Sequence, residues 1–319
     1  MPAAPVSLEG VILLGGPTAT GKSAVASLLA ERVQGEIISA DSMQVFRGLD
    51  IGAAKASLDE RSRVPHHLVD VVGLTESFDA AAWVNHVEAT LAGIRGRGNT
   101  AIICGGTGLY FKALLEGLGE SPAPDTTLRR ELERVPLEEL LDELRRKDPS
   151  MYERIDRENR RRVVRAVEVI RTSGRAYSTQ RAAWTTRSGD AHASTAKRES
   201  TRQFFGLERE RDDLRQRINQ RVETMFRNGL VQETKRLMDQ GLTENRTAMQ
   251  AIGYRQVVEH LRGERSLEET VALVKQRTWQ LARRQWTWFR RQLDLEWLMI
   301  QPGETPESVV ARLLGKLRR

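Results

Sequence analysis

Eight consecutive residues near the N-terminus carry the clearest chemical signal in the sequence. Gly16, Pro17, Thr18, Ala19, Thr20, Gly21, Lys22 and Ser23 match the pattern G-x-x-x-x-G-K-[ST] at every fixed position. In such a loop the glycines let backbone amides turn towards anionic oxygens, and the lysine adds a full positive charge. The sequence therefore predicts that these eight residues bind a phosphate or diphosphate, with the Ser23 hydroxyl as a ligand of Mg²⁺.

The elements around this loop must place it between a strand and a helix. An apolar run at residues 11–14 precedes the loop, and helical spacing of apolar residues follows it. Further strand patterns at 36–40 and 99–104 alternate with helical patterns at 78–95, which Ser77 can cap, and at 109–116. This alternation predicts an α/β fold, a P-loop core with a parallel sheet flanked by helices.

Two further reactive side chains follow predicted strands. Asp41 comes directly after the strand at 36–40, and Thr107 follows Gly105-Gly106 after the strand at 99–104. Because the carboxyl ends of parallel strands share one edge, we expect both residues to meet the phosphate loop. Asp41 there is either a proton acceptor or a helix cap. The third strand ends without a carboxylate to hold Mg²⁺, which argues against an ATPase.

The second half of the chain has a different character. Pro122 and Pro124 break the chain, residues 125–178 are helical in pattern, and 185–201 form a polar loop. We expect a first part of the core at 1–120, a helical insertion domain at 121–200, and the rest of the core at 201–319. The last part is predicted to hold strands at 204–207 and 295–300 and helices at 214–226, 231–239, 254–261, 267–292 and 306–317, with Ser266 and Glu269 as a capping box.

Charge is unevenly distributed along the 319 residues, whose formal net charge is +7. Residues 1–118 carry 9 Lys and Arg against 12 Asp and Glu, and residues 119–319 carry 41 against 31. The excess of basic residues in the second part suits a protein that binds a polyanion such as nucleic acid. The alternative is an Arg-rich composition that has no functional cause. The chain lacks a membrane-length apolar run and a signal-peptide start, so we expect a cytoplasmic protein. The single cysteine, Cys104, lies in the apolar run 101–104, which predicts a buried thiol and excludes an internal disulfide. We also expect a monomer.

Two arginine-rich stretches are candidates for anion binding. Arg217 and Arg221 are four residues apart, so on a helix they share one face, although solvated surface arginines are the alternative. Residues 283–291 interleave basic and aromatic side chains, which suits phosphate contact with base stacking. An amphipathic core helix with Trp288 or Phe289 turned inwards is the competing interpretation, and the sequence leaves open which of Trp286, Trp288 and Phe289 face outwards.

Five linked motifs resemble the bacterial tRNA dimethylallyltransferase family. They are the phosphate loop, residues 41–52 (DSMQVFRGLDIG), 65–70 (PHHLVD), 105–110 (GGTGLY) and 253–256 (GYRQ), in order over nearly the whole chain. Phe46 stands where the family usually has tyrosine, and Ala53-Ala54-Lys55 where Gly-Thr-Ala-Lys is usual. These departures affect only local contacts in that loop.

The resemblance implies a reaction and a set of roles. The dimethylallyl group of dimethylallyl diphosphate would pass to N6 of the adenosine just 3′ of the anticodon, with Mg²⁺ as cofactor and the tRNA anticodon stem-loop as partner. Asp41 would accept the N6 proton, Thr107 would hydrogen-bond the bridging oxygen, and Lys22 and Arg221 would bind the diphosphate. The tRNA contacts it implies are Asp41, Ser42, Met43, Gln44, Thr107, Arg129, Arg161, Arg162, Arg165, Gln250, Gly253, Tyr254, Arg255, Arg283, Arg284, Gln285, Trp288 and Arg290.

Two other classes of protein remain as alternatives. A P-loop small-molecule kinase would use ATP, but the Gly-Gly-Thr strand end and the basic second half disfavour it. An RNA-binding module with a non-catalytic nucleotide site is disfavoured by Asp41 and Thr107, which are expected beside the phosphate loop.

Overall fold

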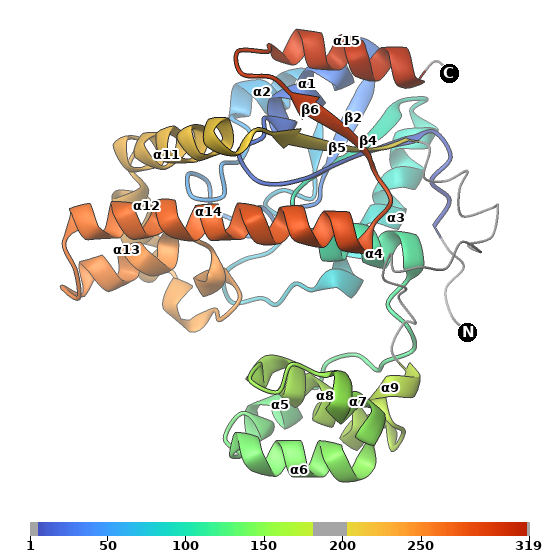
Figure 1. Cartoon of the computed structure of the whole chain (residues 1–319), viewed down its shortest axis with the longest axis vertical. Helices are drawn as coiled ribbons and strands as arrows, with labels where there is room; N and C mark the ends of the chain where they lie inside the picture. The colour runs from blue at the N-terminus through green and yellow to red at the C-terminus, as the bar shows by residue number, and fades with distance from the viewer. Residues whose placement is uncertain (1–5, 181–202, 318–319) are drawn as a thin grey trace. The chain divides into compact units, whose positions relative to one another are not determined.

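A six-stranded parallel sheet forms the centre of the larger of two compact units (Figure 1). The computed structural model describes residues 6–180 and 203–317, so the predicted loop at 185–201 lies outside the described residues. The strand order is β3-β2-β4-β1-β5-β6. The strands are β1 (Val11–Gly15), β2 (Gly35–Ser39), β3 (His66–His67), β4 (Thr100–Cys104), β5 (Phe204–Arg209) and β6 (Glu296–Ile300).

The central strand β1 explains why the predicted runs are continuously apolar. It pairs with β4 on one side and β5 on the other, and all five of its residues are buried. A strand covered on both faces needs apolar side chains at every position rather than at alternate ones. The predicted α/β class and parallel sheet are confirmed.

Helices cover both faces of this sheet. Leu14 and Phe205 belong to one apolar cluster with Leu29 of α1 and Leu313 of α15, which lie side by side in Figure 1. On the other face, the ring of Phe111 in α4 packs against Phe204 and against Phe289 of the long helix α14. The helices of this unit are α1 (Lys22–Val33), α2 (Leu58–Arg63), α3 (Ala80–Gly96), α4 (Gly108–Glu116), α11 (Arg211–Arg227), α12 (Leu230–Met238), α13 (Tyr254–Leu261), α14 (Leu267–Gln292) and α15 (Pro306–Leu317), with 3₁₀ turns at Leu242–Glu244 and Ala248–Gln250.

Most predicted helix ends are confirmed, and one cap is wrong. The bounds of α13, α14 and α15 agree with the sequence pattern, and the Ser266–Glu269 capping box is present. Helix α3 begins at Ala80 because the Asp79 carboxylate, rather than Ser77, accepts hydrogen bonds from the first turn. Helix α2 and strand β3 were not expected, since a six-residue helix without buried side chains and a two-residue strand leave no periodic signal.

Residues 115–180 form a second compact unit made of helices. Its apolar core includes Leu140 and Leu144 of one helix and Val163 and Val167 of another. The predicted domain limits at 120 and 200 stay a proposal. The helices are α5 (Thr126–Leu132), α6 (Leu137–Lys147), α7 (Pro149–Arg154), α8 (Arg160–Ser173) and α9 (Tyr177–Gln180).

Candidate active site

The phosphate loop joins β1 to α1, as predicted. Gly16 and Gly21 have φ angles of 129° and 101°, and a Cβ on Gly16 would lie 2.6 Å from the Leu207 carbonyl oxygen, so glycine is required there. Two arginines bind loop carbonyls: Arg209 Nε donates to Thr20 O (2.9 Å) and Arg217 Nε to Ala19 O (3.1 Å). These contacts fix the backbone of the loop. The Arg209 contact has no local signal that would predict it, apart from the position of Arg209 at the end of a strand.

Three cationic side chains, those of Lys22, Arg217 and Arg221, line a cavity of about 340 Å³ next to this loop. Lys22 is only 9% exposed, its Nζ donates to Pro17 O, and it lines the cavity together with Arg221 and Ser23. Burial lowers the pKa of Lys22 to about 8, and the charge of Arg221 acts in the same direction. Burial also lowers the pKa of Arg221. Since Lys22 and Arg221 both lose hydration and repel each other, a multiply charged anion would be stabilised between them.

Asp41 and Thr107 lie at the same sheet edge, as their strand-end positions predict. The Thr107 hydroxyl oxygen accepts a hydrogen bond from Ser42 N (3.1 Å), and Asp41 Oδ1 accepts one from Met43 N (2.8 Å). Asp41 also lines the cavity that holds Lys22. Within the described residues no helix begins directly after Asp41, so the helix-cap interpretation is wrong: Oδ1 stabilises a turn at residues 42–45, and the carboxylate stays in the site.

A second cavity, of about 510 Å³, shares Asp41, Thr18, Gly106, Arg221 and Gln285 with the first. Its further lining is largely apolar and comes from α11, α14 and the loop before α13: Val222, Met225, Ile252, Val274, Leu281, Trp288 and Phe289. Thr107, Ser42, Met43, Gln250 and Arg284 add polar groups to it. The cationic first cavity and the largely apolar second cavity thus meet at Asp41.

The Gly105–Gly108 segment is glycine-rich for a steric reason. A Cβ on Gly105 would overlap the backbone of Ala40, one on Gly108 the ring of Trp288, and one on Gly106 would lie 2.5 Å from Gln285 Nε2. Helix α14 and the strand-end loops therefore approach more closely than residues with side chains would allow.

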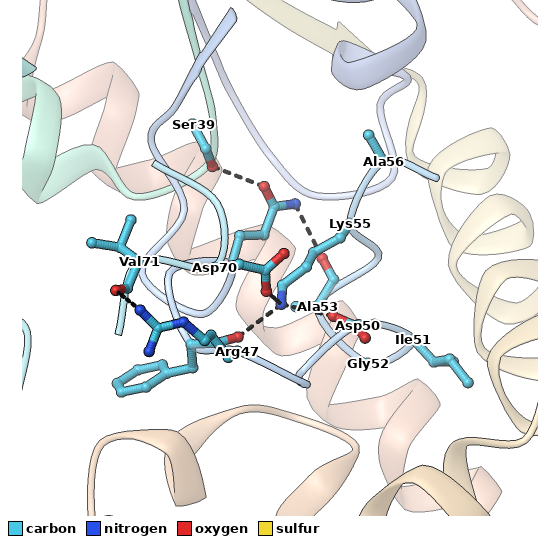
Figure 2. A network of polar contacts seen from close by, with 12 residues as sticks. Ser39, Arg47, Asp50, Ile51, Gly52, Ala53, Lys55, Ala56, Asp70 and Val71 are labelled. Atoms are coloured by element: carbon cyan, nitrogen blue, oxygen red, sulfur yellow. Dashed lines mark hydrogen bonds and ion pairs between the residues drawn. The ribbon is translucent and has the colours of Figure 1, made fainter. Parts of the chain in front are cut away.

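Lys55 joins two of the sequence motifs (Figure 2). Its Nζ, almost fully buried, donates to Phe46 O (2.7 Å) and lies 2.8 Å from Asp50 and 2.5 Å from Asp70. In the same loop, Gln44 accepts from Ser39 Oγ (2.8 Å) and donates to Ala53 O (3.2 Å). The segment after β2 is held in one shape by these contacts, and this shape places Ser42 and Met43 at the second cavity.

The residues of α14 divide between core, site and surface. Phe289 is fully buried, which confirms that at least one aromatic residue of this stretch turns inwards. Trp288 lines the second cavity, while Trp286 is 43% exposed and donates to Glu208 (3.0 Å). Arg290 pairs with the same carboxylate at 2.6 Å and lies over the Trp286 ring.

One predicted tRNA contact does not fit its position. The ring of Tyr254 is fully buried, its hydroxyl donates to Glu233 (2.6 Å), and it accepts a hydrogen bond from Gly52 N (3.0 Å). A buried ring cannot touch RNA, so Tyr254 instead ties α13 to the loop before α2. Arg255 next to it is exposed and pairs with Glu259.

The predicted arginines of the helical unit fall into two groups. Arg129 and Arg165 both pair with the fully buried carboxylate of Glu168, at 2.6 and 2.9 Å. Arg161 and Arg162 lie on the exposed surface of α8. The first two arginines thus share a buried partner, whereas Arg162 Nη1 lies 3.9 Å from Asp156 Oδ2 at the surface.

This fold and site define a P-loop enzyme of the α/β class, with a cationic cavity beside a largely apolar one. The model of the IPP transferase family matches residues 44–292. The chain is 43% identical to tRNA dimethylallyltransferase 1 of Citrifermentans bemidjiense, over 90% of this chain and 91% of that protein. It is 42% identical to the tRNA dimethylallyltransferase of Geobacter metallireducens, over 96% of each.

Solved structures agree with these relatives. The full-length tRNA isopentenylpyrophosphate transferase of Bacillus halodurans superposes with a TM-score of 0.66 at 35% identity, covering 97% of this chain and 96% of that one. A eukaryotic dimethylallyltransferase acting on tRNA shares the fold, with a TM-score of 0.70 at 22% identity, over 95% of this chain and 76% of that one. The chain belongs to the tRNA dimethylallyltransferase (IPP transferase) family of enzymes, as its motifs predict.

Proposed function

We propose that this enzyme transfers the dimethylallyl group of dimethylallyl diphosphate to N6 of the adenosine immediately 3′ of the anticodon in tRNA. The observation that carries the proposal is the position of Asp41, where the cationic cavity meets the second cavity. A donor diphosphate in the first cavity and an adenine in the second would bring N6 and the allylic carbon together beside this carboxylate.

Asp41 acts as the base in this proposal. The lone pair of adenine N6 is delocalised into the ring, so N6 is a poor nucleophile until its proton can be accepted. As the N6–C1 bond forms and the C1–O bond breaks, the N6 proton passes to the Asp41 carboxylate and the C–O electron pair leaves with the diphosphate. The Thr107 oxygen already accepts from Ser42 N, so its own hydrogen can be donated to the bridging oxygen of the donor.

The phosphate loop, Lys22 and Arg221 stabilise the leaving diphosphate. Their charges and amides lie where negative charge grows as the allylic bond breaks, which lowers the barrier. Ser23 lines this cavity, and no group of three or more His, Cys, Asp or Glu within residues 6–180 and 203–317 could hold a metal ion. A donor set of one hydroxyl fits Mg²⁺, which keeps several waters and binds substrate phosphates; bound there by Ser23, it would neutralise diphosphate charge.

The tRNA would be held by basic side chains around the second cavity and on the helical unit. Arg284 and Gln250 line that cavity, and Arg283 is exposed on the same helix as Arg284. The target adenine has to leave its stack to enter the cavity.

None of the helices in the described ranges is long and apolar enough to cross a membrane. The monomeric state and the cytoplasmic location stay predictions, and light scattering on the purified protein would test the first.

One experiment tests the proposed reaction directly. The purified protein is incubated with labelled dimethylallyl diphosphate, Mg²⁺ and unmodified tRNA, and the nucleosides are separated after digestion. We expect labelled N6-isopentenyladenosine and release of diphosphate. Turnover of ATP to ADP with no label in the RNA would favour the kinase alternative instead.

A further inference from the structure

Gln285 of α14 makes a pair of contacts that the reaction scheme does not use. Its side-chain oxygen Oε1 accepts a hydrogen bond from Thr18 N in the phosphate loop (2.9 Å), and its Nε2 donates to Gly106 O (2.9 Å). Because a backbone N–H can only donate and a carbonyl can only accept, both contacts require this orientation of the amide. Gln285 therefore joins two site loops and lines both cavities.

The surrounding structure holds this amide in place. One residue further along the helix, Trp286 Nε1 donates a hydrogen bond to Glu208, and Arg290 forms an ion pair with the same carboxylate. Near the end of α14, Lys112 Nζ donates to Gln292 O (2.8 Å). Gly106 lacks the Cβ that would lie 2.5 Å from Gln285 Nε2. These contacts hold the Gln285 amide in the position from which it accepts the hydrogen bond of Thr18 N.

This contact changes what the phosphate loop can bind. The Thr18 N–H has a single hydrogen, and the hydrogen bond to Gln285 removes it from the set of amides available to an anion. It also places an oxygen with partial negative charge beside Thr18, in the first cavity that Lys22, Ser23 and Arg221 line as well. If a diphosphate lies against Lys22 and Ser23, a third phosphate extending from it towards Thr18 would lose an amide and meet a repelling oxygen.

We infer that Gln285 is a specificity-determining residue that restricts this phosphate loop to diphosphates and excludes triphosphates such as ATP. The inference rests on the proposed use of a diphosphate donor and explains how an intact phosphate loop can serve it. It assigns to Gln285 a role towards the donor, in addition to the tRNA contact expected from the sequence.

The test compares inorganic diphosphate with inorganic triphosphate by titration calorimetry in the presence of Mg²⁺. The measured quantity is the ratio of the two dissociation constants, triphosphate over diphosphate. Gln285→Ala should lower this ratio about tenfold, the effect of one hydrogen bond to a charged group. Gln285→Glu should raise the ratio, since a full negative charge repels the longer anion more strongly.

Two further variants control for misfolding and for a general loss of rigidity around the site. Gly106→Ala displaces the Gln285 amide without changing it, and it should lower the ratio in the same direction as Gln285→Ala. Gln280→Ala is the matched control on the same helix, where the side chain contacts Arg277, and its ratio should equal that of the unmodified protein. When ATP replaces inorganic triphosphate, the ratios of the variants should rank in the same order.

An equal ratio in the unmodified protein and in all three site variants would overturn the role of Gln285. Transfer of the dimethylallyl group to tRNA is measured on the unmodified protein in parallel. Failure of that transfer would count against the proposed function, and an unchanged ratio with normal transfer would count against Gln285 alone.

Discussion

At the scale of single residues, Asp41 combines two roles that one substitution separates. Asp41→Asn keeps a side-chain oxygen for the bond from Met43 N, and it removes the proton acceptor. We expect the maximal rate of transfer to fall by roughly 10²–10⁴-fold while donor affinity and melting temperature stay nearly unchanged. Single-turnover transfer and thermal melting measure these quantities. Near-normal transfer by the variant would leave Asp41 with only its role in the turn at residues 42–45.

Lys22 makes donor binding depend on pH. Its pKa of about 8 in the protein without donor should rise when a diphosphate lies beside it, so binding takes up a proton above that pH. The affinity for dimethylallyl diphosphate is then constant below pH 8 and falls as pH rises, by at most about tenfold per unit. Calorimetry in buffers of different ionisation enthalpy measures both the affinity and the proton uptake.

Two variants at the same position control this prediction. Lys22→Arg keeps the charge at all pH values, so the fall in affinity and the proton uptake should disappear. Lys22→Ala should bind weakly throughout. A proton uptake that persists in the arginine variant would show that another group titrates.

At the scale of the elements, Glu208 anchors α14 to the sheet. Its nearly buried carboxylate accepts from Trp286 and pairs with Arg290, so Glu208→Ala leaves both donors without that partner. We expect a loss of about 1–3 kcal/mol in the free energy of unfolding, with reduced transfer because α14 carries Gln285 and Trp288 to the site. Urea unfolding measures the first and single-turnover transfer the second.

The neighbouring strand β6 offers the control for this loss. Glu296 there is exposed and pairs with Lys316 at the surface, so Glu296→Ala should cost at most about 1 kcal/mol. An equal effect of both variants would mean that Glu208 is an ordinary surface charge in energetic terms.

Two neighbouring arginines of α14 are expected to contact RNA, one of which, Arg284, also lines the second cavity. Arg283 and Arg284 are exposed, and replacing both by alanine should lower the slope of log affinity against log salt by about 1–2, since each lost phosphate contact lowers it by about 1. Binding of the donor should not change. Arg312→Ala on α15, where Arg312 pairs with Glu304, is the control. An unchanged slope for the double variant would remove these residues from the RNA footprint.

At the scale of the whole molecule, the helical unit is a separate compact unit. It has its own apolar core, and Arg161 and Arg162 lie on the exposed surface of α8. Reversing both charges, Arg161→Glu with Arg162→Glu, should weaken tRNA binding and leave the donor's thermal protection of the protein intact. Arg145→Glu with Arg146→Glu, on exposed positions of α6 in the same unit, changes the charge equally and should have a smaller effect. Equal effects of the two double variants would indicate a non-specific charge effect.

The sequence by itself determined the parts of the site that depend on local patterns. The phosphate loop, the strands on either side and the places of Asp41 and Thr107 could be predicted, because a parallel sheet brings strand ends to one edge whatever their distance along the chain. The same holds for α13, α14 and α15, whose apolar spacing and caps lie within each segment.

Only the tertiary structure decided which side chains hold that site together. Gln285 and Thr18 are 267 residues apart, and Tyr254 and Gly52 are 202 apart, so no local pattern connects them. Their contacts depend on how α13 and α14 pack on the strand-end loops, which involves side-chain fit over distances that periodicity does not describe. For this reason Tyr254 was predicted as an RNA contact and is a buried support, while Gln285 and Arg209 contact the phosphate loop itself.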